Sequence, residues 1–180
     1  MASQNLQIYT IGHSTQPIED LLRLLKDNYI RFVIDVRSQP YSRFNPQYNR
    51  DSLKFALADA QISYVFAGDS LGGRPNDPTC YKGGALPDAK ANYLKLVDYR
   101  AVMQRDWYQA GIESLLQTAG KGLTALLCSE EDPMQCHRHH LVTQTLLERG
   151  VEVWHIRANG DVQEAQPLPD KNMPQQLSLF

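Results

Sequence analysis

The chain has 180 residues, a hydrophobic fraction of 42% and a formal net charge of −2. This length suffices for one well-cored domain and is too short for two full ones. The near-neutral charge excludes the global basic field that drives non-specific binding to nucleic acid, so any such contact must be local. We find neither a secretory signal nor a run approaching the roughly 18 apolar residues of a membrane span, and we expect a cytoplasmic protein with reduced cysteines.

Short apolar runs alternate with helix-like stretches along the chain. The apolar runs predict strands over residues 6–11, 31–36, 62–67, 123–128 and 151–156. Helical spacing of apolar residues predicts helices over residues 18–28, 51–60, 93–119 and 136–149. We expect the third helix to be interrupted or kinked at Gly111 and the fourth to end at Gly150. Asn159-Gly160 is a turn signal that could begin a short edge hairpin.

This alternation predicts an α/β fold with a mainly parallel five-stranded sheet and helices on both faces, a three-layer, Rossmann-like arrangement in a single domain. Residues 1–164 would form this domain. From residue 165 the composition changes to proline, glutamine and small polar residues, so residues 165–180 are expected to form a flexible tail.

Polar or glycine-rich loops follow the first four predicted strands. Because the carboxyl ends of parallel strands share one edge, where open α/β sheets bind ligands, we expect these loops to form one site. The expected ligand-binding residues are Gly12, Ser14, Arg37, Ser42, Asn45, Gly72, Gly73 and Cys128. The expected catalytic residues are His13, Asp35, Glu130, Cys136, His137 and Arg138.

The same four loops carry a family resemblance. The sequence reads TIGHS after the first strand, DVRSQPYSRFN after the second, LGG after the third and LLCSEEDPMQCHR through the fourth. Together these segments resemble domain-of-unknown-function family 488. The resemblance implies an α/β domain and functional importance for Cys128, Cys136, His137 and Arg138, and it implies no reaction.

Cys136 is the best candidate for a nucleophile. It would lie near the start of a helix, where backbone amides and the neighbouring His137 and Arg138 favour a thiolate. Such surroundings lower a thiol pKa from about 8.5 to between roughly 3.5 and 7.5. His13 or His137 would act as general acid or base, and Arg37 and Arg138 would hold an anionic group.

The acidic loop after Cys128 suggests a different role for that cysteine. Glu130 and its two acidic neighbours would repel an anion, so Cys128 is expected to be buried or paired with Cys136. Glu130 itself would act as an acid or base if desolvated. Asp35 would orient His13 or pair with Arg37.

Other roles for the cysteines stay open. Cys136 and His140 share a helix face, and Cys128 or Cys80 could complete a zinc site. The spacing lacks the paired short knuckles of structural zinc sites, so no metal ligand is assigned and the cofactor is left unknown. A Cys128–Cys136 disulfide and simple packing are further alternatives.

Aromatic and arginine residues alternate after the second strand. Tyr41, Phe44 and Tyr48 interleaved with Arg43 and Arg50 resemble a surface on which a base or sugar could stack. The alternative is a small satellite core under the loop.

The C-terminus suggests a partner. The last residues, QLSLF, resemble the short motif by which bacterial proteins dock on the DNA polymerase sliding clamp. Leu177, Leu179 and Phe180 would enter an apolar groove, Gln176 would supply a polar anchor, and the preceding segment would act as a tether. Alternatively, the tail covers an apolar patch on its own domain or on a neighbour.

These observations favour a bacterial, cytoplasmic enzyme, a cysteine-dependent transferase or hydrolase, that is recruited to the clamp for DNA repair or processing. One alternative is a thiol-dependent enzyme acting on a small anionic metabolite. The other is a non-enzymatic adaptor associated with the clamp.

Overall fold

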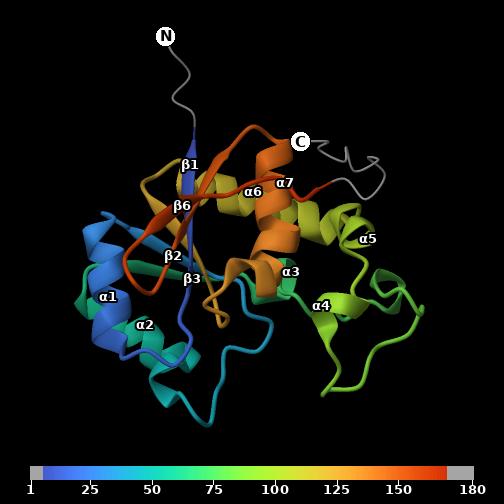
Figure 1. The fold of residues 1–180 in the computed structure, drawn as a ribbon, viewed down its shortest axis with the longest axis horizontal. Coiled ribbons are helices and arrows are strands. Elements are labelled where there is room, and N and C mark those ends of the chain that lie inside the picture. The colour runs from blue at the N-terminus through green and yellow to red at the C-terminus, as the bar shows by residue number, and fades with distance from the viewer. Residues whose placement is uncertain (1–5, 170–180) are drawn as a thin grey trace, which may run out of the picture.

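A computed structural model of the chain describes residues 6–169, in which six strands form one sheet (Figure 1). The strands are β1 (Gln7–Gly12), β2 (Phe32–Asp35), β3 (Ser63–Phe66), β4 (Thr124–Cys128), β5 (Glu152–Ile156) and β6 (Val162–Glu164). Their order is β3-β2-β4-β1-β5-β6, and every neighbouring pair is parallel except β5 and β6. The predicted α/β fold with a mainly parallel sheet is confirmed. The sheet has six strands rather than five, because the turn at Asn159-Gly160 leads into an antiparallel edge strand.

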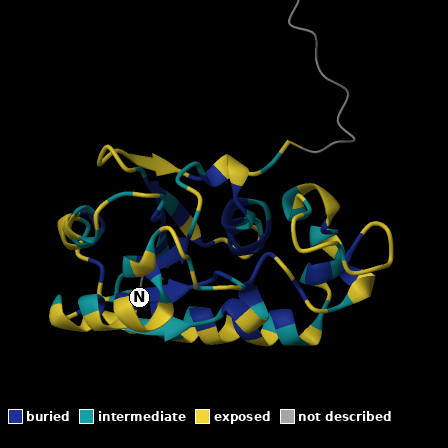
Figure 2. Ribbon diagram, turned by 90° about the horizontal axis from the view of Figure 1, so that it is seen from below, coloured by how far each residue is buried: buried dark blue, intermediate teal, exposed yellow. Residues whose placement is uncertain are grey.

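Helices pack against both faces of the sheet (Figure 1). They are α1 (Ile18–Asp27), α2 (Arg50–Asp59), α3 (Gly68–Leu71), α4 (Tyr93–Leu96), α5 (Tyr99–Met103), α6 (Asp106–Ala119) and α7 (Gln144–Glu148), with 3-10 turns η1 (Pro46–Tyr48), η2 (Pro78–Cys80) and η3 (Pro133–Gln135) and a π-helical segment η4 (Arg138–Thr143). The α1 and α2 side chains share one core with alternate strand residues. Those of α3, α5, α6 and α7 form the other core. Figure 2 shows buried residues between the layers and exposed residues on the outer helix surfaces.

The predicted helix over residues 93–119 is divided into α4, α5 and α6. Its breaks lie at residues 97–98 and 104–105, and Asp98 caps α5 by accepting a hydrogen bond from the Ala101 amide at 3.1 Å. The break expected at Gly111 is wrong, since this residue lies inside α6. A Cβ there would approach Ser70 Oγ to 2.6 Å. Glycine therefore permits the close packing of α6 against α3.

The predicted helix over residues 136–149 is also irregular. It consists of the π-helical η4 followed by α7, and Gly150 ends it with a φ of +74°, as expected of a helix-terminating glycine. π-helical turns are rare and are frequent at functional sites. The π-helical segment η4 begins directly after Cys136 and His137. The backbone is therefore irregular next to the candidate nucleophile.

The sheet order places a topological switch between β1 and β4. From β1 the chain passes through α1 to β2 and on to β3, with its helices on one face. From β4 it passes through η4 and α7 to β5, on the other side of β1 and over the other face. The loops after β1 and β4 therefore diverge, and in open α/β sheets such a divergence opens the crevice in which ligands bind.

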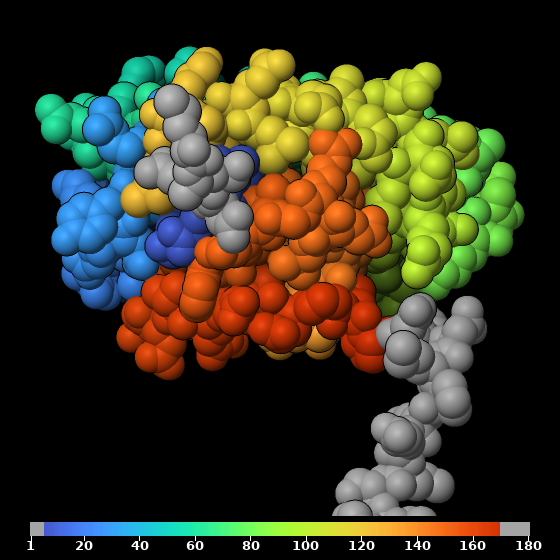
Figure 3. Space-filling view, turned by 90° about the horizontal axis from the view of Figure 1, so that it is seen from above, coloured from blue at the N-terminus to red at the C-terminus, as the bar shows by residue number. Residues whose placement is uncertain are grey.

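The segment after β6 packs against the start of α7 (Figure 3). Ala165 is buried and its amide donates to the Val153 carbonyl at 2.8 Å, while the Leu168 amide donates to Gln144 Oε1 at 2.9 Å. Gln176, Leu177, Leu179 and Phe180 lie outside the described residues. Within residues 6–169, no helix combines the length and the hydropathy needed to cross a bilayer.

A buried chain of hydrogen bonds connects η4 to β1 and β5. Arg138 Nε donates to Thr10 Oγ1 at 3.2 Å, Thr10 Oγ1 lies 2.7 Å from His155 Nδ1, and His155 Nε2 lies 3.0 Å from His139 Nδ1. Because Thr10 accepts from Arg138, its hydroxyl hydrogen is free for His155, which in turn donates to His139. Burial lowers the pKa of His139 to about 4 and that of His155 to about 3. Both rings are therefore neutral at neutral pH.

Acidification is expected to destabilise the protein in the range where unfolded histidines titrate. The unfolded rings take up protons near their ordinary pKa of 6.5, whereas His139 and His155 remain neutral in the folded state until about 4 and about 3. The free energy of unfolding should therefore fall as the pH is lowered from about 7 to about 5. Urea denaturation at both pH values measures this fall, and His155→Gln should reduce it. Equal stability at the two pH values would contradict the prediction.

Candidate functional site

A pocket of about 620 Å³ opens at the carboxyl ends of the strands. Its lining includes Tyr41 and Ser42 from the loop after β2, and Ala91 and Asn92, which lead into α4. Loops from four strands contribute to its wall, as the shared edge predicts. The predicted site residues that line it are His13, Ser14, Arg37, Ser42, Asn45, Gly73, Cys128, Glu130, Cys136 and His137. Gly12, Asp35, Gly72 and Arg138 lie behind this lining.

Two cysteines and one histidine converge at the wall of the pocket. Cys128 Sγ lies 3.6 Å and Cys136 Sγ 3.9 Å from His137 Nδ1. His137 Nε2 lies 3.1 Å from the Val36 carbonyl oxygen, to which only a protonated nitrogen can donate. The Val36 carbonyl therefore fixes the orientation of the ring and leaves Nδ1 to exchange a proton with the sulfurs.

The two thiols differ in acidity. Burial alone would raise the pKa of Cys136, but hydrogen bonds from Cys128 and His137 and the charges of His137 and Arg138 hold it well below its usual range. The Arg138 amide adds a hydrogen bond to Cys136 Sγ at 3.4 Å. Cys128, whose thiol donates to Cys136 and is buried, has a pKa well above its usual range. These surroundings therefore favour the thiolate at Cys136 over one at Cys128, which supplies a supporting hydrogen bond.

Asp35 and Arg37 form a buried ion pair beneath the pocket. Arg37 Nε and Nη2 donate to the two Asp35 carboxylate oxygens at 2.8 Å and 2.6 Å, and the Tyr64 hydroxyl donates to the same carboxylate at 2.7 Å. Although burial works to lower it, the hydrogen bonds and charge of Asp35 raise the pKa of Arg37 above its ordinary value. Of the two predicted roles of Asp35, the structure shows the pairing with Arg37.

His13 is held neutral next to this ion pair. Its Nε2 accepts from Arg37 Nη1 at 3.1 Å, its Nδ1 donates to the Ser14 carbonyl at 2.7 Å, and its ring stacks on Tyr48 with centroids 4.1 Å apart. Burial lowers the pKa of His13 to about 4. With both nitrogens engaged, His13 is positioned by its neighbours, and His137 is the histidine that contacts the sulfurs.

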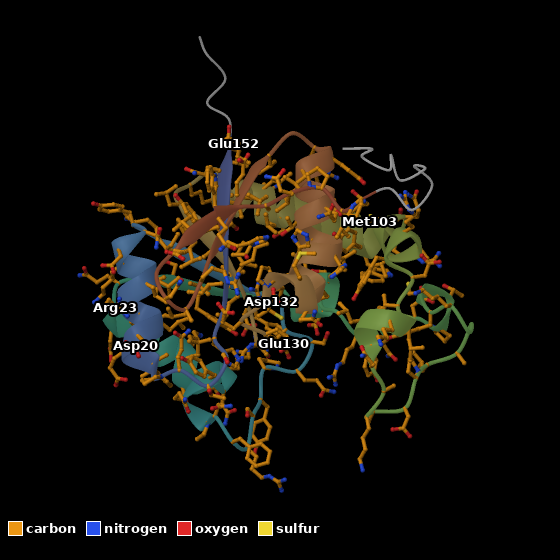
Figure 4. The ribbon with its side chains drawn as sticks, viewed as in Figure 1. Asp20, Arg23, Met103, Glu130, Asp132 and Glu152 are labelled. Carbon is orange, nitrogen blue, oxygen red and sulfur yellow. The ribbon has the colours of Figure 1, made fainter. Side chains whose placement is uncertain are left out.

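Removal of the Asp35 charge should be strongly destabilising. Asp35→Asn leaves the buried Arg37 guanidinium without its counter-ion, and breaking a buried ion pair in this way typically costs about 3–5 kcal/mol. Chemical denaturation measures the loss. The control is Asp20→Asn, which breaks the exposed pair with Arg23 on α1 (Figure 4) and should cost less than about 1 kcal/mol. Equal losses in the two variants would contradict a structural role for the Asp35–Arg37 pair.

Arg138 is not among the residues that line the pocket. Its guanidinium is fully buried and donates to the backbone carbonyls of Glu130 and Glu131 as well as to Thr10. The expectation that it holds a substrate anion is therefore not supported by its placement, because these acceptors occupy the charged end. Gly12 lies beside the same loop, where a Cβ would come within 1.7 Å of the Glu130 carbonyl oxygen. Both residues position the loop after β4.

The acidic loop is less repulsive to anions than its sequence suggests. Glu131 forms two hydrogen bonds with Arg157 at 2.9 Å and 2.8 Å, which lower its pKa to about 2. Asp132 caps η3 by accepting from the Met134 amide at 2.9 Å. Glu130 is the acidic side chain of this loop that lines the pocket (Figure 4).

The glycines after β3 permit close packing around His137. A Cβ at Gly73 would lie 2.6 Å from Cγ of His137, and one at Gly72 would lie 2.3 Å from Ser38 Oγ. A side chain at Gly73 would therefore displace the histidine ring. These glycines support the site by their lack of a side chain.

The aromatic and arginine residues after β2 do not form one surface. Tyr48 is buried against His13, whereas Tyr41 and Phe44 are 73% and 83% exposed. The Arg43 guanidinium lies 5.3 Å from the centroid of the Phe44 ring. The predicted stacking surface is therefore reduced to Tyr41, which lines the pocket, and the neighbouring Phe44.

Several lining residues escaped the sequence analysis. Tyr99 and Arg74, which packs over Tyr93 at 4.5 Å, line the pocket from α5 and from the segment after β3. The Tyr99 hydroxyl is buried with no hydrogen-bond partner among the described residues. Ser129 follows Cys128 and could have been found by its place at a strand end. Tyr99 carried no such signal because tertiary packing brings α5 to the pocket.

The fold and the pocket define an α/β protein with two buried cysteines and a partly buried histidine at the switch point of its sheet. The sequence profile described as Domain of unknown function DUF488 matches residues 17–145, which is more than half of the chain. The protein therefore belongs to the DUF488 family. No curated protein and no solved structure matches the chain.

Proposed function

We propose that the pocket is the active site of a cysteine-dependent transferase or hydrolase, with Cys136 as nucleophile and His137 as the group that takes and returns the proton. The observation that carries this proposal is the convergence of both sulfurs on His137 Nδ1, with the ring oriented by the Val36 carbonyl. Nucleophilic cysteine sites combine a thiolate, a nearby base and a third group that orients the base.

The surroundings favour a small polar substrate. We infer a three-layer, Rossmann-like arrangement, in which the switch point lies between β1 and β4. The pocket at this point is lined by the hydroxyl side chain of Ser42 and the amide side chain of Asn45. Arg37 is neutralised by Asp35, so Arg74 is the lining arginine better placed to bind an anionic group.

Selective alkylation tests the nucleophile. In metal-free native protein, Cys136 should react with iodoacetamide at neutral pH at least about tenfold faster than Cys80, and His137→Asn should slow that reaction. Mass spectrometry of peptides locates the label, and Cys80→Ser serves as the control that keeps the fast phase. A native Cys136 that reacts no faster than Cys80 would rule out an activated thiolate.

The tail motif supports a second part of the proposal, namely that the enzyme is recruited to a bacterial sliding clamp and acts in DNA repair or processing. Its support is the sequence QLSLF at residues 176–180, with Gln176 as the polar anchor and Leu177, Leu179 and Phe180 as apolar ones. The alternatives are an enzyme for a small anionic metabolite with an incidental tail, and a clamp-associated adaptor without activity.

Clamp binding is expected to depend on the last five residues. Surface plasmon resonance with immobilised clamp should detect the full chain, and deletion of residues 176–180 or Phe180→Ala should weaken binding at least about tenfold. Ser178→Ala is the matched control within the same segment and should bind like the full chain. Unchanged binding after the deletion would refute recruitment by the tail and leave the metabolite enzyme as the leading function.

A further inference from the structure

We propose that Cys128, Cys136 and His137 bind one Zn²⁺ ion whose fourth coordination position faces the pocket. This proposal rests on the proposed function, because both place the chemistry of the protein at these side chains. It adds a metal-bound state in which Cys136 is withdrawn from alkylation. Within residues 6–169, the potential ligand atoms of these three side chains all lie within 4.8 Å of one another. They are therefore close enough to bind one metal ion.

The distances match tetrahedral coordination. Zinc binds sulfur at about 2.3 Å and nitrogen at about 2.0–2.1 Å, which separates neighbouring sulfur and nitrogen ligands by roughly 3.6 Å. The observed separations from His137 Nδ1 are 3.6 Å for Cys128 Sγ and 3.9 Å for Cys136 Sγ. To bind the ion, the sulfur atoms and His137 Nδ1 would shift by a few tenths of an ångström relative to one another, without rearrangement of the backbone.

The hydrogen-bond partners of the ligands are also those expected at a metal site. A metal-bound histidine usually donates its other ring N–H to a carbonyl or carboxylate, and His137 Nε2 has the Val36 carbonyl at 3.1 Å. The Arg138 amide donates to Cys136 Sγ at 3.4 Å, as a coordinated thiolate accepts. Gly73 leaves room for the ring. His137 and Cys136 are thus oriented before an ion arrives.

The donor set selects the kind of ion. Thiolate and imidazole ligands suit zinc, whereas Mg²⁺ and Ca²⁺ prefer oxygen. Cys128 and Cys136 are 6% and 2% exposed, and two thiolates in this buried place would balance the charge of a divalent ion. Three protein ligands would leave a fourth position open to the pocket, and in this metal-bound state Cys136 is a ligand and not the nucleophile.

The sequence spacing alone suggested His140 in place of His137, and Cys80 as an alternative to Cys128. His140 Nε2 lies 2.8 Å from the Met134 carbonyl oxygen, and its nearest ring neighbours are Tyr99 and His139. Cys80 is buried elsewhere, at the end of η2. Both residues therefore serve as matched controls. Ion binding displaces the proton of the Cys128 thiol, which passes to solvent, and it changes no oxidation state.

Metal titration tests the site on the full chain. After removal of metal with a chelator, we expect one Zn²⁺ per chain to be taken from a chromophoric chelator. Co²⁺ should give the charge-transfer absorption of thiolate ligands and the visible bands of a tetrahedral ion. Cys128→Ser and His137→Asn should weaken Zn²⁺ binding at least about tenfold, whereas Cys80→Ser and His140→Asn should bind like the unmodified chain. Circular dichroism verifies that each variant is folded.

The inference is overturned by folded protein that takes up no Zn²⁺, by uptake that Cys128→Ser leaves unchanged, or by a Co²⁺ spectrum without thiolate bands. Alkylation separates this result from the proposed function. Slow alkylation of metal-free Cys136 together with Zn²⁺ uptake would refute the nucleophile and keep the metal site. Fast alkylation that Zn²⁺ does not suppress would keep the nucleophile and refute the metal site.

Discussion

The buried guanidinium of Arg138 connects the parts of the molecule on which the pocket depends. It donates to Thr10 in β1 and to two consecutive carbonyls, those of Glu130 and Glu131, in the loop after β4. A charge in this environment is tolerable only because oxygen acceptors surround it. Since Arg138 directly follows Cys136 and His137, the contacts that solvate its charge also place those two residues above the sheet edge. Gly12 at the end of β1 packs closely against the Glu130 backbone and so also holds the loop after β4 in place.

The central strands and the position of the pocket could be predicted because both depend on local signals. The runs around Val33 and Leu126 are continuously apolar, as strands covered on both faces must be, and polar loops follow them. Parallel strands then bring these loops to one edge, whatever the order of the strands. This reasoning was sufficient to place His13, Cys136 and Glu130 in one pocket.

The rest depends on tertiary contacts. The sixth strand has exposed residues and no apolar pattern, so that only the turn at Asn159-Gly160 indicated its hairpin with β5. Gly111 was expected to break a helix, and instead provides packing space against Ser70. Arg138 begins the π-helical segment η4, whose irregular backbone helical spacing does not reveal. Its position next to two candidate catalytic residues suggested substrate binding, whereas its hydrogen bonds show support of a loop.

The depth of the two sulfurs limits the shape of what can react with them. Cys128 and Cys136 have almost no exposed surface, and the pocket is the route to His137 and its sulfurs. A DNA duplex is too broad to reach them. For an enzyme brought to DNA, the reacting group would have to be a nucleotide turned out of the helix or a frayed strand end, because an unstacked base is narrow enough to enter a pocket of this kind. The geometry thus confines such an enzyme to nucleotides that have left the base-paired stack, at a strand end or by extrusion from the helix.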